Sequence, residues 1–452
     1  MTTQVQNVPW WKEPTRSQWA GFAAAWVGWV LDAFDFTIYI LVMSHIAKEF
    51  GVGIAAVAGS LTLTLLVRLA GGAVSGWMAD RWGRRLPLLL SLVWFAVFDA
   101  AIYFAPSFTW VLVFRTLFGF GMGAEWTAGT ALAMECFPAR SRKIASGLLQ
   151  AGWPIGFFLA AATAYYVVPA WGWRAMFLIA IAPALLVLPI RFLVPEEHSK
   201  AKPAAATSKG ALADLWVPAV RVRIVLGSLL MALGFIVYYG LTTTHSLIQI
   251  QELGLSPQTA FANVCWFQVG MLVGVIAAGM VANRFGVVTA LVAPALLMVP
   301  ALPLFVGASP GLITLGAVLG GALGAGYSGV TPVLVTSLFP EHVRARAIGL
   351  VYHLGALLAA FVPWGIPELS ARTGWKLSTT VELVVGVGLV AMAGAVFGLR
   401  RMLAPVTSTP STIEVVDASA PAARGAAAAA PAAGFVPPVE ARASFAASAA
   451  ES

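Results

Sequence analysis

The chain has 452 residues, of which 60% are hydrophobic and only 10% are charged. Soluble proteins carry roughly 25% charged residues, so this composition predicts that almost the whole chain lies in a membrane. The net charge of +8 does not indicate nucleic-acid binding, because the basic residues cluster in short segments between apolar runs. The two cysteines, Cys136 and Cys265, form no CxxC pattern, so neither a disulfide framework nor a thiolate metal site is indicated.

A helix that crosses a bilayer needs about 20 mostly apolar residues. The first eighteen residues are polar and show no cleavable signal pattern. Beyond them, twelve apolar runs predict an all-α integral membrane protein with twelve transmembrane helices. The runs cover residues 19–42, 54–78, 87–106, 109–133, 143–168, 174–194, 223–247, 258–282, 287–307, 311–336, 345–367 and 378–402.

Polar segments divide the chain into five parts. We expect a cytoplasmic N-terminus (1–18), a six-helix bundle (19–194), a cytoplasmic linker (195–222), a second six-helix bundle (223–402) and a cytoplasmic tail (403–452). The Ala/Pro/Ser-rich tail has little large apolar surface to bury, which predicts disorder. With this arrangement, 19 of the 27 Lys and Arg residues fall on the side of the two termini and four in loops on the other side. The positive-inside rule therefore places both termini in the cytoplasm.

Two loop motifs recur at nearly one offset, which indicates an internal repeat. The glycine- and arginine-rich loop that begins at Gly76 returns 203 positions later at Gly279. A second segment that begins with Phe137-Pro138 returns 202 positions later as Phe339-Pro340. Carriers built from two parallel repeats bind substrate near the membrane midplane, between the repeats. The sequence therefore predicts a carrier with two pseudo-symmetric halves.

The two glycine-containing loops are interpreted as gates. Glycines permit tight turns and close helix contacts, and Asp80 could accept hydrogen bonds from a neighbouring helix N-terminus. The second loop has Asn283 in place of the acid, which predicts a weaker latch. The alternative is a pair of basic loops that only fix topology. The gating set is Gly76, Asp80, Arg81, Gly83, Arg84 and Arg85 in the first loop, and Gly279, Asn283, Arg284 and Gly286 in the second.

Acidic residues within apolar runs are costly and mark functional sites. Asp32 and Asp35 lie three positions apart, on one face of the first predicted helix, and Glu125 lies in the fourth. Burial and a neighbouring carboxylate both favour the protonated form, so such a group could exchange a proton near neutral pH. We assign these three residues to proton coupling. The alternative is a structural ion pair with Arg68 or Arg115, and a pair that breaks on protonation would serve both roles.

Two arginines inside the membrane suit an anionic substrate. A guanidinium group can hold a carboxylate through two hydrogen bonds, so Arg68 and Arg115 could bind substrate or clamp an internal acid. The seventh predicted helix contains a polar run that includes His245, and such a run could bind substrate. The alternative is that the run marks the end of the helix, where it emerges into water. The expected substrate-binding set is Arg68, Arg115, Tyr39, Tyr239, Thr243, His245, Gln150 and His353.

Signatures of enzymes are not visible in the sequence. It contains no Gly-x-x-x-x-Gly-Lys-(Ser/Thr) loop for ATP, no cluster of metal ligands and no Ser-His-Asp arrangement. We therefore expect neither an enzyme nor a bound cofactor or metal. The energy should come from a proton gradient or from the substrate's own gradient.

The motifs resemble those of the major facilitator superfamily. The loop at Gly76–Arg85 resembles its signature between the second and third helices, and Arg115-x-x-x-Gly119-x-Gly121 resembles its fourth-helix motif. The segments around Asp32, Glu125 and Trp173 are similar to the sialate:proton symporter family, which includes sialic acid and lactate-type monocarboxylate carriers. This resemblance implies proton symport of an organic anion. The short linker, without extra spans, favours a small carboxylate over a bulky sugar acid.

These observations predict a monomeric bacterial inner-membrane carrier that works by alternating access. It would take up a small organic anion with a proton, such as lactate, pyruvate, sialate or an aromatic acid. A metabolite or drug exporter or antiporter of the same superfamily is the alternative within the class. A non-transporting membrane sensor is the alternative outside it, although neither the linker nor the tail resembles an output domain. A channel suits the two-half repeat less well.

Overall fold

The computed structural model describes residues 9–82, 85–137, 142–182, 185, 214–307, 310–339 and 341–400, and every regular element among them is helical. One compact unit covers residues 1–405. The second unit, 406–452, lies outside the described residues, as does most of the predicted linker.

The first five predicted runs of the N-terminal half are largely helical, whereas α6 covers only the start of the sixth run (174–194), most of whose remainder lies outside the described residues. Thr15 caps the first helix, because its hydroxyl accepts from the Gln18 N–H while the Gln18 side chain accepts from the Thr15 N–H. The short turns η1 (Trp10–Lys12) and η2 (Ile102–Phe104) accompany the main helices. These helices are α1 (Arg16–Phe50), α2 (Ile54–Trp82), α3 (Arg85–Ala101), α4 (Phe108–Cys136), α5 (Arg142–Trp171) and α6 (Ala175–Ile179).

The C-terminal half is more segmented. Its helices are α10 (Pro218–Leu247), α11 (Pro257–Phe285), α12 (Val287–Phe305), α13 (Ile313–Leu319), α14 (Thr331–Ser337), α15 (Glu341–Ala359), α16 (Val362–Thr373) and α17 (Leu377–Leu399). Single-turn elements join them: η3 (Asp214–Trp216), the π-helical η4 (Ile248–Glu252), η5 (Pro310–Leu312), the π-helical η6 (Gly320–Ala325) and η7 (Gly326–Gly329). Helix α10 begins five residues before the predicted run at 223–247.

Two predicted spans are interrupted rather than continuous. The run at 311–336 changes from α13 to η6, η7 and α14 because glycine is common there and a helix interior is unfavourable for glycine. The run at 345–367 breaks between α15 and α16 just before Pro363. A proline disfavours helical conformation in the residue before it and cannot donate a backbone hydrogen bond, so it suits the first turn of a new helix.

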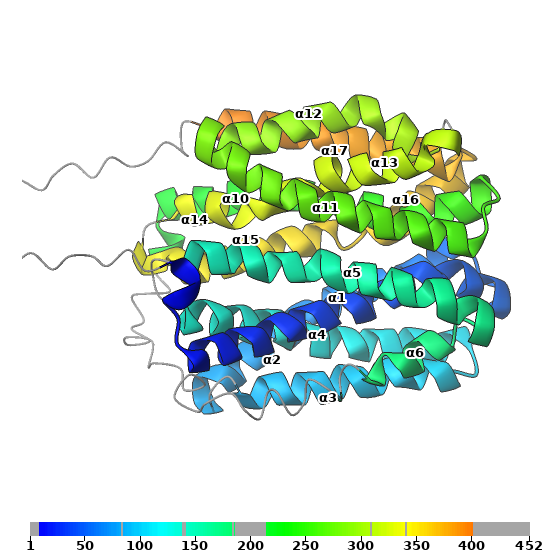
Figure 1. The fold of residues 1–452 in the computed structure, drawn as a ribbon, viewed down its shortest axis with the longest axis horizontal. Helices are drawn as coiled ribbons and strands as arrows, with labels where there is room; N and C mark the ends of the chain where they lie inside the picture. Colours follow the sequence, from blue (N-terminus) through cyan, green and yellow to red (C-terminus); the bar gives the residue numbers. More distant parts are fainter. Residues whose placement is uncertain are drawn as a thin grey trace, which may run out of the picture. The chain divides into compact units, whose positions relative to one another are not determined.

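Eight helices in the described part of the chain are long and apolar enough to cross a membrane, judged by length and composition. Two shorter apolar helical segments, Leu89–Phe104 and Phe108–Gly123, accompany them. Figure 1 shows the helices running side by side, with α1–α6 grouped together and α10–α17 grouped together. The two groups contact each other mainly where α5 packs on α11 and where α2 packs on α16.

Close glycine contacts repeat between the two halves. A Cβ atom at Gly119 of α4 would clash with the backbone of Thr64 in α2, and one at Gly321 of η6 would clash with the backbone of Phe267 in α11. Gly321 and Phe267 follow Gly119 and Thr64 by 202 and 203 positions. The absence of a side chain lets the two backbones approach in both halves. The repeat predicted from the loops therefore extends to the helix crossings.

A second repeated contact, which the loop motifs did not reveal, closes one end of each half. Glu49 at the end of α1 accepts hydrogen bonds from the Trp173 indole at 2.6 Å and from Arg174 at 2.7 and 3.0 Å. Glu252, 203 positions later, accepts from the backbone N–H groups of Leu377 and Ser378 at the start of α17. We call these contacts the Glu49 clamp and the Glu252 clamp.

The turns beside the clamps repeat as well. Gly51 and Gly254, also 203 positions apart, follow the clamp carboxylates and have φ values of 62° and 63°. Glycine adopts this left-handed conformation without the steric cost that a Cβ atom brings. In each half, the first helix is thus followed by a glycine turn, and a glutamate beside that turn forms the clamp.

Candidate functional site

The buried charges are distributed unequally between the halves. Among the described side chains, every buried aspartate and arginine belongs to the N-terminal half: Asp32, Asp35, Arg68, Asp99 and Arg115. In the described part of the C-terminal half, the buried polar side chains are His245 and uncharged groups. The buried aspartate and arginine side chains of the described residues, which could exchange a proton or bind an anion, are therefore concentrated on α1, α2, α3 and α4.

Arg68 lies where the two halves meet. Its guanidinium forms an ion pair with Asp32, with 3.6 Å between Nη2 and Oδ2, and both side chains are buried. Arg68 also interacts electrostatically with Tyr239 of α10 and with Tyr352 and His353 of α15. Three of the predicted substrate residues, Arg68, Tyr239 and His353, are thus brought together with Asp32.

Aromatic side chains from both halves surround this pair. The Phe36 ring lies 6.0 Å from Trp153 of α5 and 6.5 Å from Tyr239, measured between ring centroids. The Trp153 indole donates a hydrogen bond to the Tyr238 hydroxyl. Phe235 stacks on Tyr239 at 5.6 Å and meets Tyr352 edge-on at 5.3 Å. We call Phe36, Trp153, Phe235, Tyr238, Tyr239 and Tyr352 the aromatic cluster.

Arg115 belongs to a separate group inside the N-terminal half. It donates a hydrogen bond of 3.2 Å to Asp99, and both side chains are fully buried. Its guanidinium lies 4.4 Å above the Tyr39 ring, and the Tyr39 hydroxyl is bonded to Ser60 at 2.5 Å. The sequence reading left open whether Arg115 clamps an internal acid. The structure supplies Asp99 as that acid.

Asp35 lies between the two ion pairs. It is 1% exposed and interacts electrostatically with Asp32, Asp99 and Arg115. Its Oδ1 atom has no hydrogen-bond partner among the described residues. Asp35 therefore interacts by charge with Asp32 of the first ion pair and with both members of the second, Asp99 and Arg115.

His245 is held in a polar chain inside the C-terminal half. Its ring nitrogen lies 2.8 Å from the Gln249 amide, Asn263 donates to Gln249 at 2.8 Å, and Thr314 donates to Asn263 at 2.8 Å. The imidazole also stacks on Phe305 with 4.5 Å between ring centroids. The Thr243 hydroxyl is bonded to the Tyr239 carbonyl of its own helix at 2.6 Å. The contacts of His245 and Thr243 lie within the C-terminal half, so the structure does not join these two residues to the Arg68 group.

The remaining predicted residues divide into three groups. Gln150 of α5 is half-buried, and its Oε1 atom has no partner among the described residues. Arg81, Asn283 and Arg284 are exposed near helix ends, as is Gly286, while Gly279 is half-buried. The side chains of Glu125, Gly76, Asp80 and Arg85 lie outside the described part of the chain, as do Gly83 and Arg84 entirely.

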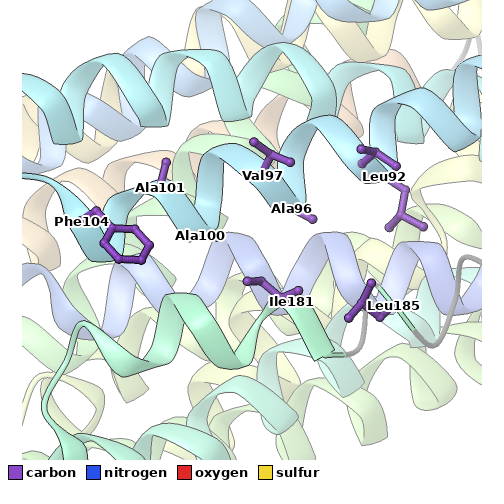
Figure 2. Close-up of a pocket in the computed structure, with 9 residues that line it drawn as sticks. Leu92, Ala96, Val97, Ala100, Ala101, Phe104, Ile181 and Leu185 are labelled. Atoms are coloured by element: carbon purple, nitrogen blue, oxygen red, sulfur yellow. The ribbon is translucent and has the colours of Figure 1, made fainter.

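A recess elsewhere on the molecule is unsuited to an anion. It has a volume of about 360 Å³ and lies between α3 and the segment that follows α6, where Val97 faces Ile181 and Leu185 (Figure 2). Its lining is hydrocarbon, from leucine, valine, alanine, isoleucine and phenylalanine side chains. Such a surface suits lipid chains and offers no partner for a carboxylate.

The sequence reading missed most of the aromatic cluster. Phe235, Tyr238 and Tyr239 recur at positions i, i+3 and i+4, which places them on one helix face, and this spacing was an available signal. No local pattern linked Phe36, Trp153 and Tyr352 to them, because these residues come from three different helices. Asp99 of α3 pairs with Arg115 of α4, and the sequence analysis did not include Asp99 among the functional residues.

Known transport proteins are similar in sequence to most of the chain. The chain is 30% identical over 431 residues to the probable 4-methylmuconolactone transporter of Cupriavidus pinatubonensis, covering 92% of this chain and 97% of that protein. It is 28% identical to the cis,cis-muconate transport protein of Acinetobacter baylyi, covering 83% and 91%. It is 26% identical to the sialic acid transporter NanX of Escherichia coli, covering 83% and 93%.

The fold is also similar to that of transporters with solved structures. The crystal structure of a D-xylose–proton symporter matches with a TM-score of 0.71 at 20% identity, covering 83% of this chain and 97% of that chain. Residues 25–267 match the Major Facilitator Superfamily. The chain therefore belongs to the major facilitator superfamily and is a multi-pass membrane transporter, not an enzyme.

Proposed function

We propose that this transporter takes up a small unsaturated or aromatic organic acid together with a proton. The observation that carries the proposal is the buried Asp32–Arg68 pair beside the aromatic cluster. A guanidinium group binds a carboxylate through a fork of two hydrogen bonds, and aromatic rings offer flat faces to a conjugated substrate. The relatives named for 4-methylmuconolactone and muconate support this class of substrate.

The balance of buried charge supports proton coupling. In the described N-terminal half, three buried carboxyl groups face two guanidinium groups, so one added proton balances the set. A proton on Asp32 would remove the charge that holds Arg68 and would free the guanidinium for a substrate carboxylate. Asp35, which interacts with both Asp32 and Arg115, would relay the effect between the two ion pairs. Glu125 remains a predicted member of the coupling set.

The predicted substrate-binding residues divide into those proposed to contact the substrate directly and those proposed to act indirectly. Arg68, Tyr239, His353 and Gln150 would contact the substrate, because the first three share one electrostatic neighbourhood and Gln150 carries an unpartnered amide oxygen. Arg115, Tyr39, Thr243 and His245 stay in the predicted set. Their contacts with neighbouring residues support an indirect role, in which they hold α1 and α10 in position.

The finer topology is part of the proposal. We infer twelve membrane helices in two six-helix halves with both termini in the cytoplasm of a bacterial cell, bounded as in the sequence prediction. The carrier would act as a monomer in the inner membrane, use the proton gradient without a cofactor, and alternate access by rocking one half against the other. The predicted gating loops at Gly76–Arg85 and Gly279–Gly286 would close the cytoplasmic side.

Uptake of a substrate panel tests the proposal directly. Cells that express the transporter would be given lactate, pyruvate, sialate, benzoate, cis,cis-muconate and xylose, with and without a protonophore. We expect saturable uptake of benzoate or cis,cis-muconate that the protonophore abolishes. Uptake of lactate, sialate or xylose alone would overturn the proposed substrate class. A rise in the cellular accumulation of a cargo when the protonophore is added would favour an exporter.

A further inference from the structure

Gln268 of α11 is a buried amide that lacks a partner. Its side chain is 2% exposed, and neither Nε2 nor Oε1 has a hydrogen-bond partner among the residues that the structure describes. Buried polar groups are nearly always hydrogen-bonded, and an exception calls for a specific explanation. The other buried amides of this half, Gln249 and Asn263, are bonded in the chain that holds His245.

The face of α11 that carries Gln268 points into the protein. A row of exposed apolar side chains marks the lipid-facing side of this helix: Trp266, Val269, Val273, Ile276 and Met280. Gln268 belongs to a second row at the same helical spacing, with Val264, Met271 and Val275, all of them buried. This buried row lies between the side of α11 that contacts α5 at Cys265 and the side that packs on α13 and η6 at Gly270 and Gly274.

Gln268 lies at the depth of the aromatic cluster. The Cys265 thiol points to the Phe158 carbonyl at 3.8 Å, which fixes the level at which α5 and α11 meet. The two helices lie side by side and run antiparallel (Figure 1), so one turn onward along α11 corresponds to one turn back along α5. Gln268 therefore lies level with the turn of α5 that includes Trp153, whose indole is bonded to Tyr238. Within the cluster, Arg68 interacts with Tyr239 and Tyr352, whereas Trp153 contacts Phe36 and Tyr238.

We propose that Gln268 is a specificity-determining residue, which hydrogen-bonds a second polar group of an organic acid whose first carboxylate lies at Arg68. The inference rests on the proposed function and narrows its substrate class. The preferred acids would carry a ring hydroxyl or a second carboxylate at the end remote from the first. A primary amide can donate to a carboxylate and accept from a hydroxyl, so it serves both groups.

The test compares three acids built on one ring: benzoate, 4-hydroxybenzoate and benzene-1,4-dicarboxylate. Initial uptake rates would be measured in proteoliposomes, with empty liposomes to subtract passive entry. Wild type should prefer the two substituted acids over benzoate. Gln268→Leu should lower this preference by about 10-fold or more while retaining benzoate uptake, because it removes one hydrogen-bonding group. Gln268→Glu should impair uptake of the dicarboxylate more than that of the hydroxy acid, because two carboxylates repel.

A matched control and clear contrary outcomes keep the test decisive. Met271→Leu, one turn along the same buried row, should leave all three rates in their wild-type ratio. If wild type shows no preference, or if Gln268→Leu changes all three rates by one factor, Gln268 has a structural role or binds water only, and the inference is wrong. If wild type carries none of these acids and no other organic acid, the proposed function itself fails, whatever Gln268 does.

Discussion

At the scale of single residues, the account depends on ionisable groups held in apolar surroundings. Asp32, Asp35, Arg68, Asp99 and Arg115 are all buried, and their opposite charges stabilise one another. Isolated charges in such surroundings are very costly, so each is tied to the state of its neighbours. A change in the protonation or in the ligand of one of these groups therefore changes the electrostatic energy of the others.

Asp35→Asn should uncouple transport from the proton gradient. The substitution keeps the shape of the side chain and removes its ability to carry a proton between the two ion pairs. We expect accumulation driven by a proton gradient to be lost while exchange of labelled for unlabelled substrate continues. Asp35→Glu, which keeps the carboxyl group, should retain part of the accumulation. Full accumulation in the Asn variant would show that Asp35 does not carry the proton.

The Arg115–Asp99 pair allows a structural role to be separated from substrate binding. Arg115→Met leaves the Asp99 charge buried without its partner and should cost about 3–5 kcal/mol of stability. Replacing both, as Arg115→Met with Asp99→Leu, should recover most of that loss, because an apolar pair avoids desolvation of two charges. Thermal unfolding in detergent measures both variants. A stable double variant that has lost substrate affinity would instead assign Arg115 to the substrate.

Single residues were predicted better than their pairings. Each buried charge could be found from the sequence, because an Asp or Arg within an apolar run stands out. Arg68 pairs with Asp32 and Arg115 pairs with Asp99. These pairings depend on contacts between helices, which the hydropathy pattern does not encode. His245 was assigned to substrate for its polarity, and the sequence did not show that Gln249, one turn further on, is its partner. The hydrogen-bonded chain then continues from Gln249 through Asn263 to Thr314.

At the scale of helices, close crossings and end contacts hold each half together. The crossing of α2 and α4 needs a glycine at position 119, and the crossing of α11 and η6 needs one at position 321. The helices themselves could be predicted from apolar runs. The breaks within 311–336 and 345–367 could not, because hydropathy does not change where a glycine row or a proline alters the backbone.

Gly119→Ala should destabilise the crossing of α2 and α4. Its methyl group would meet the Thr64 backbone, which cannot move aside as a flexible side chain can. Overpacking of this kind costs about 1–3 kcal/mol. Gly398→Ala in α17 is the control, because a Cβ atom there has nothing within 4 Å and alanine favours helix. Equal unfolding temperatures for both variants would argue against the close approach.

The Glu49 clamp should contribute measurably to stability. Glu49→Gln removes the charge that accepts three hydrogen bonds from Trp173 and Arg174. Because the Glu49 side chain is 43% exposed, solvent screening reduces the loss to about 1 kcal/mol. Glu368→Gln, which breaks the exposed pair with Arg372 within α16, should change the unfolding temperature far less. The opposite order would contradict the clamp.

At the scale of the whole molecule, two repeated halves carry unequal chemistry. The helix crossings and the clamps recur at offsets of 202 and 203 positions, so both halves share one mechanical design. The described buried charges belong to the N-terminal half, while the C-terminal half contributes aromatic and amide groups. In the proposed mechanism, rocking of the similar halves would produce the movement, and the unequal linings would bring proton and substrate to one site.

The most direct test of the central claim is uptake of cis,cis-muconate and 4-hydroxybenzoate by reconstituted liposomes, with and without an imposed inward proton gradient. The account predicts accumulation above the external concentration only when the gradient is present. It also predicts that Arg68→Lys, which keeps the charge but loses the guanidinium fork, weakens apparent affinity by about 10-fold or more. Accumulation that is the same with and without the gradient would contradict proton-coupled transport of an organic acid.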